Sequence, residues 1–206
     1  MPHSPADPPT LAILAGGAGS RMGRPKAWLR FGGRPALDYL LDRFAWPGPT
    51  LLVTAPGHEH PPGWQRFMAE ATDPVPAQGP LRGVLTALEH CRTDVLLVTT
   101  VDMPHVAAPH LLWLAAELCA RPEALGVLPV RRAAAEQVEP FPCALARSAK
   151  SAVAAHLAEG RRSVHSLLAR PGFTRVTAPA DWGELVWTNL NLPSDLQAFL
   201  HPPGGD

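Results

Sequence analysis

The pattern of apolar residues predicts strands and helices that alternate along the first half of the chain. Residues 10–15 form a continuous apolar run that ends in glycines, as expected of a buried central strand. Residues 35–44 place leucines and a phenylalanine at helical spacing, and residues 50–54 form a second apolar run. Residues 80–91 predict another helix, and residues 94–101 form the clearest strand of the sequence.

The second half of the chain continues this alternation. Residues 109–118 carry a wide apolar face, which predicts a helix that starts at a proline. Residues 124–130 and 141–146 are strand candidates, and residues 149–159 predict a helix that ends at Gly160. Repeated alternation implies an α/β fold with three layers, in which a mostly parallel sheet has helices on both faces. Ligands of such sheets bind beyond the carboxyl ends of the strands.

The composition places the chain among globular proteins. It has 206 residues, 46% of them apolar, and no formal net charge, so we expect a single domain over residues 1–206 with a sizeable core. Nucleic-acid-binding surfaces need an excess of Lys and Arg, so no nucleic-acid partner is expected. Prolines cluster in residues 1–9, which predicts a flexible leader. The sequence has no apolar run of membrane-spanning length and no secretion signal, which makes the cytoplasm the expected location.

The first apolar run leads into a glycine-rich segment, residues 14–26, with the sequence LAGGAGSRMGRPK. Glycines allow backbone N–H groups to approach phosphates closely, and the two cations Arg21 and Lys26 can neutralise phosphate charge. The segment therefore predicts a loop that binds a nucleoside triphosphate. The residues expected to bind it are Leu14, Ala15, Gly16, Gly17, Gly19, Arg21 and Lys26.

Two commoner phosphate-binding loops do not fit this segment. A dinucleotide-binding fingerprint requires Gly-x-Gly-x-x-Gly, but Met22 stands where the third glycine should follow Gly17 and Gly19. A P-loop ends in Gly-Lys-Ser or Gly-Lys-Thr, but Gly23 is followed by Arg-Pro-Lys, which offers no hydroxyl to magnesium.

A single carboxylate, Asp102, follows the strand predicted over residues 94–101. A carboxylate at a strand end is well placed to hold Mg²⁺, which prefers oxygen ligands and bridges them to substrate phosphates. Taken alone, Asp102 is equally well explained as a turn or helix-capping aspartate before Pro104. Because the glycine loop and Asp102 both follow predicted parallel strands, they can share one site.

Asp73 precedes the segment Gly-Pro-Leu-Arg-Gly at residues 79–83. Its carboxylate can accept two hydrogen bonds from N1 and N2 of guanine, or bind ribose hydroxyls. Taken alone, the segment is better explained by an ordinary Asp-Pro turn and a helix that starts at Pro80.

Near the C-terminal end, residues 188–196 read TNLNLPSDL. Asn189 and Asn191 are two apart on a segment expected to be extended, so their amides point the same way and suit a polar acceptor substrate. Asp195 is expected to have a structural role at the start of the last helix.

These motifs together resemble the signature of the molybdenum cofactor guanylyltransferase family, which consists of MobA-like nucleotidyltransferases. The resemblance rests on residues 14–17, Arg-Met-Gly at residues 21–23, Lys26, the Asp73 and Gly-Pro-Leu-x-Gly pair, and residues 188–196. It implies a Rossmann-like nucleotidyltransferase fold. Within it, residues from about 10 to 105 would form the nucleotide-binding half, and those from about 106 to 201 the acceptor-binding half.

By this resemblance the protein is expected to transfer GMP from GTP to the terminal phosphate of molybdopterin, or of its molybdenum-loaded form, and to release pyrophosphate. The implied cofactor is Mg²⁺, and molybdoenzymes or cofactor-delivery proteins are possible partners. Arg21, Lys26 and Asp102 would be catalytic, with Asp102 as the metal ligand and Asp73 beside the guanine. The acceptor would be bound by Asn189, Asn191, Arg161 and Arg162, although adjacent exposed arginines such as the last two are usually only solvated.

Two residues depart from the family pattern and keep alternatives open. Pro25 stands where the family often has an aspartate, and Pro56 follows the second strand where an asparagine is common. One alternative is a cytidylyltransferase that acts on molybdopterin or on a sugar or polyol phosphate. The other is a non-catalytic adaptor that binds nucleotide or molybdopterin.

Overall fold

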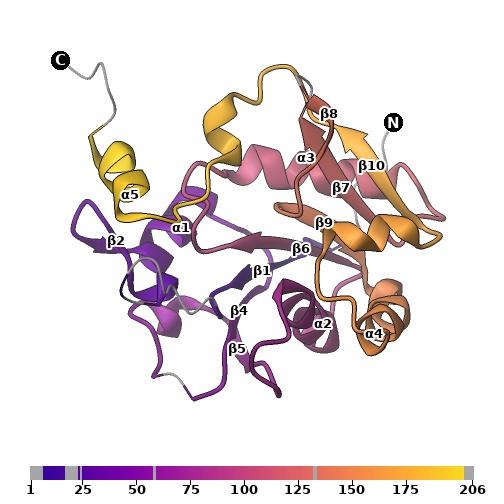
Figure 1. The fold of residues 1–206 in the computed structure, drawn as a ribbon, viewed down its shortest axis with the longest axis horizontal. Helices are drawn as coiled ribbons and strands as arrows, with labels where there is room; N and C mark the ends of the chain where they lie inside the picture. Colours follow the sequence, from indigo (N-terminus) through magenta and orange to yellow (C-terminus); the bar gives the residue numbers. More distant parts are fainter. Residues whose placement is uncertain (1–6, 17–22, 24, 58, 132–133, 202–206) are drawn as a thin grey trace.

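One mixed β-sheet runs through the described part of the chain, which comprises residues 7–16, 23, 25–57, 59–131 and 134–201 of a computed structural model. The eight strands of this sheet are β1 (Thr10–Leu14), β4 (Thr50–Thr54), β5 (Ala69–Thr72), β6 (Val95–Thr100), β7 (Gly126–Arg131), β8 (Ala134–Val138), β9 (Cys143–Ala146) and β10 (Phe173–Thr177). They lie in the order β10-β7-β9-β6-β1-β4-β5, and β8 pairs with β7 (Figure 1).

Most strands of the sheet run in the same direction. β1 pairs in parallel with β4 and β6, β4 with β5, and β7 with β10. β9 is antiparallel to both β6 and β7, and β8 is antiparallel to β7. β9 therefore lies between β6 and β7, which run in the same direction, and β9 runs in the opposite direction. The predicted α/β architecture with a mostly parallel sheet is confirmed.

Helices cover both faces of the sheet. The five α-helices of the described residues are α1 (Ala36–Phe44), α2 (Pro80–His90), α3 (Ala108–Cys119), α4 (Lys150–Ala158) and α5 (Pro193–Leu200). α2 packs against α4 and contacts β1, β4 and β5, whereas α3 contacts β6, β7 and β9. In Figure 1, α2 and α4 lie in front of the sheet and α3 lies behind it. The three layers predicted from the alternation are therefore present.

Short elements connect these layers. A two-stranded hairpin is formed by β2 (Arg30–Phe31) and β3 (Arg34–Pro35), and it leads directly into α1. Short 3₁₀ helices lie at Lys26–Trp28, Trp64–Arg66, Arg147–Ala149, His165–Ala169 and Glu184–Trp187. None of the helices in the described ranges has the length and apolar character needed to cross a bilayer.

The elements that the apolar pattern predicted are those that supply the core. All five residues of β1 are buried, and the buried face of α1 carries Leu37, Leu40, Leu41 and Phe44. The pattern missed the strands β5, β8 and β10, each of which pairs with a single neighbour in the main sheet. In β5 only Ala71 is buried, and in β10 the buried residues Phe173 and Val176 are three apart. Edge strands bury few side chains, so they carry no clear period of two.

We expect the buried centre of the sheet to dominate stability. Leu97 on β6 is fully buried, so Leu97→Ala should lower the free energy of unfolding by about 2–5 kcal/mol. Leu112 on α3 is 52% exposed, and Leu112→Ala should change it by no more than about 0.5 kcal/mol. Urea unfolding of both variants checks this, and equal losses would contradict the assigned core.

Candidate functional site

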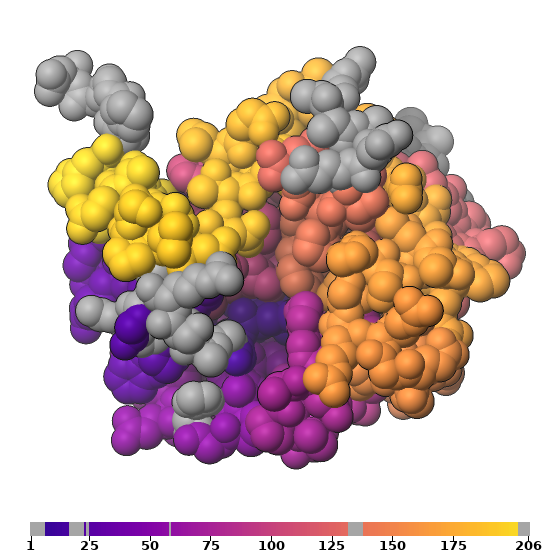
Figure 2. All heavy atoms as spheres, viewed as in Figure 1, coloured from indigo at the N-terminus to yellow at the C-terminus, as the bar shows by residue number. Residues whose placement is uncertain are grey.

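A pocket of about 520 Å³ opens at the carboxyl ends of β1, β4 and β6. Leu14, Val53 and Thr100, which stand at or near the ends of these three strands, all line it. Figure 2 shows this face hollowed between the yellow C-terminal segment and the magenta α2. The location is the one expected for ligands of parallel sheets, and the volume is typical of a small-molecule site.

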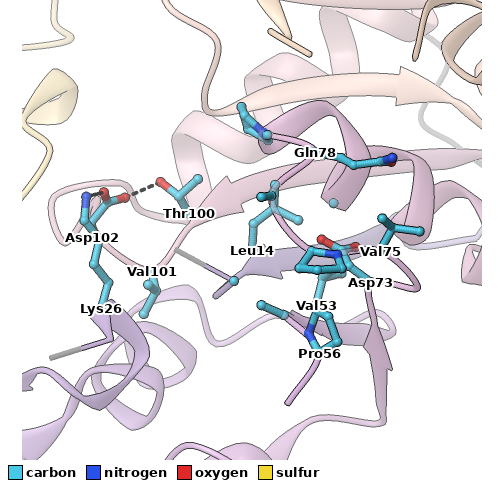
Figure 3. Close-up of a pocket in the computed structure, with 17 residues that line it drawn as sticks. Leu14, Lys26, Val53, Pro56, Asp73, Val75, Gln78, Thr100, Val101 and Asp102 are labelled. Carbon is cyan, nitrogen blue, oxygen red and sulfur yellow. Dashed lines mark hydrogen bonds and ion pairs between the residues drawn. The ribbon is translucent and has the colours of Figure 1, made fainter. Parts of the chain in front are cut away.

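One end of the pocket holds a largely buried ion pair. The ammonium Nζ of Lys26, at the start of a 3₁₀ helix, lies 2.5 Å from Oδ2 of Asp102, two residues after the end of β6. Oδ1 of the same carboxylate accepts a hydrogen bond of 2.5 Å from the Thr100 hydroxyl (Figure 3). The side chains of Lys26 and Asp102 are only 18% and 10% exposed, so little water weakens their attraction.

The C-terminal segment contacts this ion pair. Lys26 Nζ also donates a hydrogen bond of 2.6 Å to Oδ1 of Asn191, and the Leu190 N–H donates to the backbone carbonyl of Asp102 at 2.9 Å. Asp195 Oδ2 accepts from the N–H groups of Asn191 and Leu192, both at 2.8 Å. The structural role predicted for Asp195 is therefore confirmed, because its carboxylate holds the turn that presents Asn191.

The two predicted asparagines have different surroundings. Asn191 reaches Lys26, whereas the half-buried Asn189 donates a hydrogen bond from Nδ2 to the carbonyl of Trp187 at 3.4 Å. The Asn189 carbonyl in turn accepts from Nδ2 of Asn191 at 3.4 Å. Asn191 thus lies at the ion pair, and Asn189 supports the segment from the side.

The other end of the pocket contains a second carboxylate, Asp73, among apolar side chains. Figure 3 shows Asp73 beside Val53, Pro56 and Val75, with Leu14 between this group and the Lys26–Asp102 pair. Burial raises the pKa of Asp73 above its ordinary value of 3.8, and a hydrogen bond from Thr86 opposes that shift. Apolar walls around a carboxylate acceptor suit a heterocyclic base.

The described part of the glycine loop approaches the sheet closely. Gly16 lines the pocket, and a Cβ at this position would lie 3.3 Å from the backbone nitrogen of Ala55, tighter than most real contacts. The Ala15 N–H donates to the Val53 carbonyl at 2.8 Å, which anchors the start of the loop. Gly17, Gly19 and Arg21 lie outside the described residues. The expectation that the loop and Asp102 share one site is confirmed for Gly16.

The arginine pair lies in the exposed loop after α4. The Arg162 carbonyl accepts a hydrogen bond from the Leu81 N–H at 3.1 Å, and its Nη1 donates to the carbonyl of Ala77 at 3.2 Å. Ala77 lines the pocket, so Arg162 supports the pocket rim, and both Arg161 and Arg162 are exposed to solvent. Gly79 adopts a φ of +74°, and a Cβ there would lie 2.9 Å from the Arg162 carbonyl oxygen. A glycine is therefore needed where the two segments meet.

Several pocket residues were not singled out from the sequence. Thr100 is one of two threonines that end an otherwise apolar strand, which is a usable signal for a polar site at that end. Val53 could not have been found in this way, because an apolar residue inside a strand is usually core. Val75 is 46% exposed in the connection after β5 and carries no polar or periodic signal. Gln78 lies in a proline-rich connection without periodicity.

Comparison with known proteins identifies relatives along nearly the whole chain. Residues 11–175 match the model of the MobA-like NTP transferase domain. A probable molybdenum cofactor guanylyltransferase of Deinococcus radiodurans is 32% identical, and the match covers 92% of each chain. A molybdenum cofactor guanylyltransferase of Cereibacter sphaeroides is 36% identical over 89% of this chain and 91% of that protein.

A solved structure supports the same fold. The molybdopterin-guanine dinucleotide biosynthesis protein A of Archaeoglobus fulgidus superposes with a TM-score of 0.76, covering 92% of this chain and 96% of that one. The sequence identity is 22%, so this likeness bears on the fold alone.

The raised pKa of Asp73 predicts how stability changes when its charge is removed. Ionising Asp73 costs the folded protein stability, and this cost appears as the pH rises from about 3.8 through the raised pKa. Asp73→Asn keeps an acceptor oxygen for Thr86 and removes the charge. We therefore expect the variant to be at least as stable as the wild type in urea unfolding at pH 7. A clear loss of stability at pH 7 would contradict this assignment.

Proposed function

This chain belongs to the family of MobA-like NTP transferase domains, and we propose that it transfers GMP from GTP to the terminal phosphate of molybdopterin, or of its molybdenum-loaded form, with release of pyrophosphate. It is a nucleotidyltransferase. The observation that supports this function best is the pocket itself. It has an apolar end with one carboxylate, Asp73, and a charged end with Lys26 and Asp102.

The apolar end suits the guanine base. The Asp73 carboxylate can accept hydrogen bonds from N1–H and from the 2-amino group, which cytosine does not offer in that arrangement. Val53 and Pro56 border the same end and provide flat apolar surface for the ring. Leaving either donor of the base without a partner would be costly, so a single well-placed carboxylate can discriminate between bases.

The charged end suits the triphosphate and the metal. Lys26 carries the cation, and the N–H groups of the glycine loop, Gly17 and Gly19 included, would add uncharged donors, with Arg21 as a second cation. Asp102 Oδ2 and Asn191 Oδ1 both lie within 2.6 Å of the Lys26 ammonium. Two oxygens that already converge on one cation fit the donor preference of Mg²⁺.

Asp102 would therefore hold Mg²⁺, with substrate phosphates and water as the remaining ligands. No cluster of three or more His, Cys, Asp or Glu side chains is placed to bind a metal within the ranges that the structure describes. This agrees with the usual binding of Mg²⁺ through one or two carboxylates plus phosphates. When bound, Mg²⁺ would neutralise phosphate charge and polarise the α-phosphate.

The reaction requires alignment more than acid–base chemistry. An oxygen of the acceptor phosphate attacks the α-phosphorus of GTP, and the bond from that phosphorus to the oxygen bridging to the β-phosphate breaks. The attacking oxygen is already ionised at neutral pH, so no general base is needed. Lys26 would stabilise the charge that develops on pyrophosphate, and the pocket walls would hold the two reactants in line.

The acceptor is proposed to bind on the side of the C-terminal segment. Asn191 already lies at the ion pair, and Asn189 supports the same segment. Arg161 and Arg162 lie in the loop that meets the pocket rim, where they can attract an anionic pterin phosphate. Molybdopterin is thus the proposed second substrate, and molybdoenzymes or cofactor-delivery proteins are proposed recipients of the product.

Removal of either charge of the ion pair should abolish the reaction. Pyrophosphate release from GTP and molybdopterin should fall at least about 100-fold in Lys26→Ala and in Asp102→Asn, because each substitution removes charge stabilisation at the reacting phosphates. Lys150→Ala and Asp94→Asn, at exposed positions, are matched controls and should retain activity.

The same assay decides between the alternatives. Circular dichroism and urea unfolding establish that the variants are folded. If the wild type releases pyrophosphate faster from CTP than from GTP, the protein is a cytidylyltransferase. Absence of pyrophosphate release from both nucleotides with molybdopterin as the acceptor would refute the proposed transfer and leave the non-catalytic adaptor or a cytidylyltransferase that acts on a sugar or polyol phosphate. Near wild-type rates in both site variants would refute the assigned roles.

A further inference from the structure

Two side chains of α2 form a buried chain of hydrogen bonds that ends at the Asp73 carboxylate. Arg82 and Thr86 are four residues apart on this helix and are only 9% and 1% exposed. Nε and Nη2 of Arg82 both lie 3.2 Å from the Thr86 hydroxyl oxygen, and that hydroxyl lies 2.6 Å from Oδ1 of Asp73. Arg82 is itself anchored, because Nη2 donates to Oε2 of Glu89 at 2.7 Å.

The chemistry of these groups sets the direction of each hydrogen bond. A guanidinium can only donate, and a hydroxyl has one hydrogen and two lone pairs. The two contacts from Arg82 therefore occupy the acceptor capacity of the Thr86 hydroxyl. Its single hydrogen points to Asp73 Oδ1, so Arg82 fixes Thr86 as a donor and Asp73 as the acceptor.

This arrangement also orients the carboxylate. Oδ1 is held toward α2, and Oδ2 lies 3.8 Å from the position that a Cβ would take at Gly83. Gly83 lines the pocket and has no side chain, so the space beside Oδ2 stays open to a ligand. Thr86 does not line the pocket, yet its hydrogen bond sets the orientation of the Asp73 carboxylate.

We propose that Thr86, polarised and held by Arg82, is a positioning residue that orients Asp73 as a hydrogen-bond acceptor for the guanine base. This inference rests on the proposed function, because it assigns Asp73 to the base. The Thr86 hydroxyl acts only through Asp73, so its removal affects nucleotide affinity and base discrimination. The transfer step at the far end of the pocket is unaffected.

The test compares Thr86→Val, which has nearly the same shape but no hydroxyl, with Thr86→Ser, which keeps the donor. Isothermal titration with GTP and with ITP, which lacks the 2-amino group, measures affinity and discrimination. Thr86→Val should raise the Kd for GTP about tenfold and reduce the preference for GTP over ITP. The kcat at saturating GTP should stay near that of the wild type, and Thr86→Ser should restore both affinity and preference.

Controls separate this inference from the proposed function. Thr177→Val, at an exposed position on β10, should bind GTP as the wild type does. A wild-type protein that binds GTP no better than CTP would refute the proposed function itself. If Asp73→Asn loses GTP affinity while Thr86→Val keeps it, the proposed function stands and the positioning role of Thr86 is refuted. Thr86→Ser that behaves like Thr86→Val would refute that role as well.

A second variant keeps the test decisive if Thr86→Val does not fold. Arg82→Met removes both donors to Thr86 and leaves its hydroxyl free to rotate away from Asp73. A several-fold rise in the Kd for GTP is expected, because the acceptor is then less well held. An unchanged Kd in this variant would overturn the inference.

Discussion

The ion pair between Lys26 and Asp102 is the interaction on which the rest of the site depends. It joins three distant parts of the chain, since Lys26 follows the glycine loop, Asp102 lies two residues after the central strand β6, and Asn191 of the C-terminal segment shares the same ammonium. Breaking a desolvated pair leaves an uncompensated charge, so the arrangement persists until another charge replaces one partner. A triphosphate with its metal is such a replacement. The pair therefore holds the three segments of the site together, and in our proposal a highly charged ligand takes the place of one partner.

A threonine hydroxyl orients the carboxylate at each end of the pocket. Each carboxylate has one oxygen held by a threonine hydroxyl, Thr100 for Asp102 and Thr86 for Asp73, so each is oriented before any ligand binds. Their environments then set their roles. Asp102 is beside a cation at a strand end and suits phosphate and metal. Asp73 is among apolar side chains, where burial raises its pKa, and suits the neutral donors of a base. One sheet edge thus presents two acceptors with different chemistry.

Sequence patterns identified the elements that bury most apolar surface and the polar residues at their ends. β1, α2 and β6 were predictable because runs and helical spacing report burial directly, and Asp102 and Lys26 because each follows an apolar or glycine-rich segment. Asp73 was indicated only by the resemblance to the guanylyltransferase family, because without that resemblance an Asp-Pro turn explains it better. The contact between Lys26 and Asn191 spans 165 positions and depends on how the C-terminal segment packs, which no local pattern encodes. The role of Thr86 was hidden for a similar reason, because a threonine inside an apolar helix has no signal until its partners are placed.

A crystal structure of the protein with GTP and Mg²⁺ tests the central claim most directly, because the claim concerns which end of the pocket binds which part of the nucleotide. The account predicts that guanine N1 and N2 lie within hydrogen-bond distance of Asp73, with the triphosphate at Lys26 and the metal on Asp102. A nucleotide bound in the opposite orientation, or outside this pocket, would contradict it.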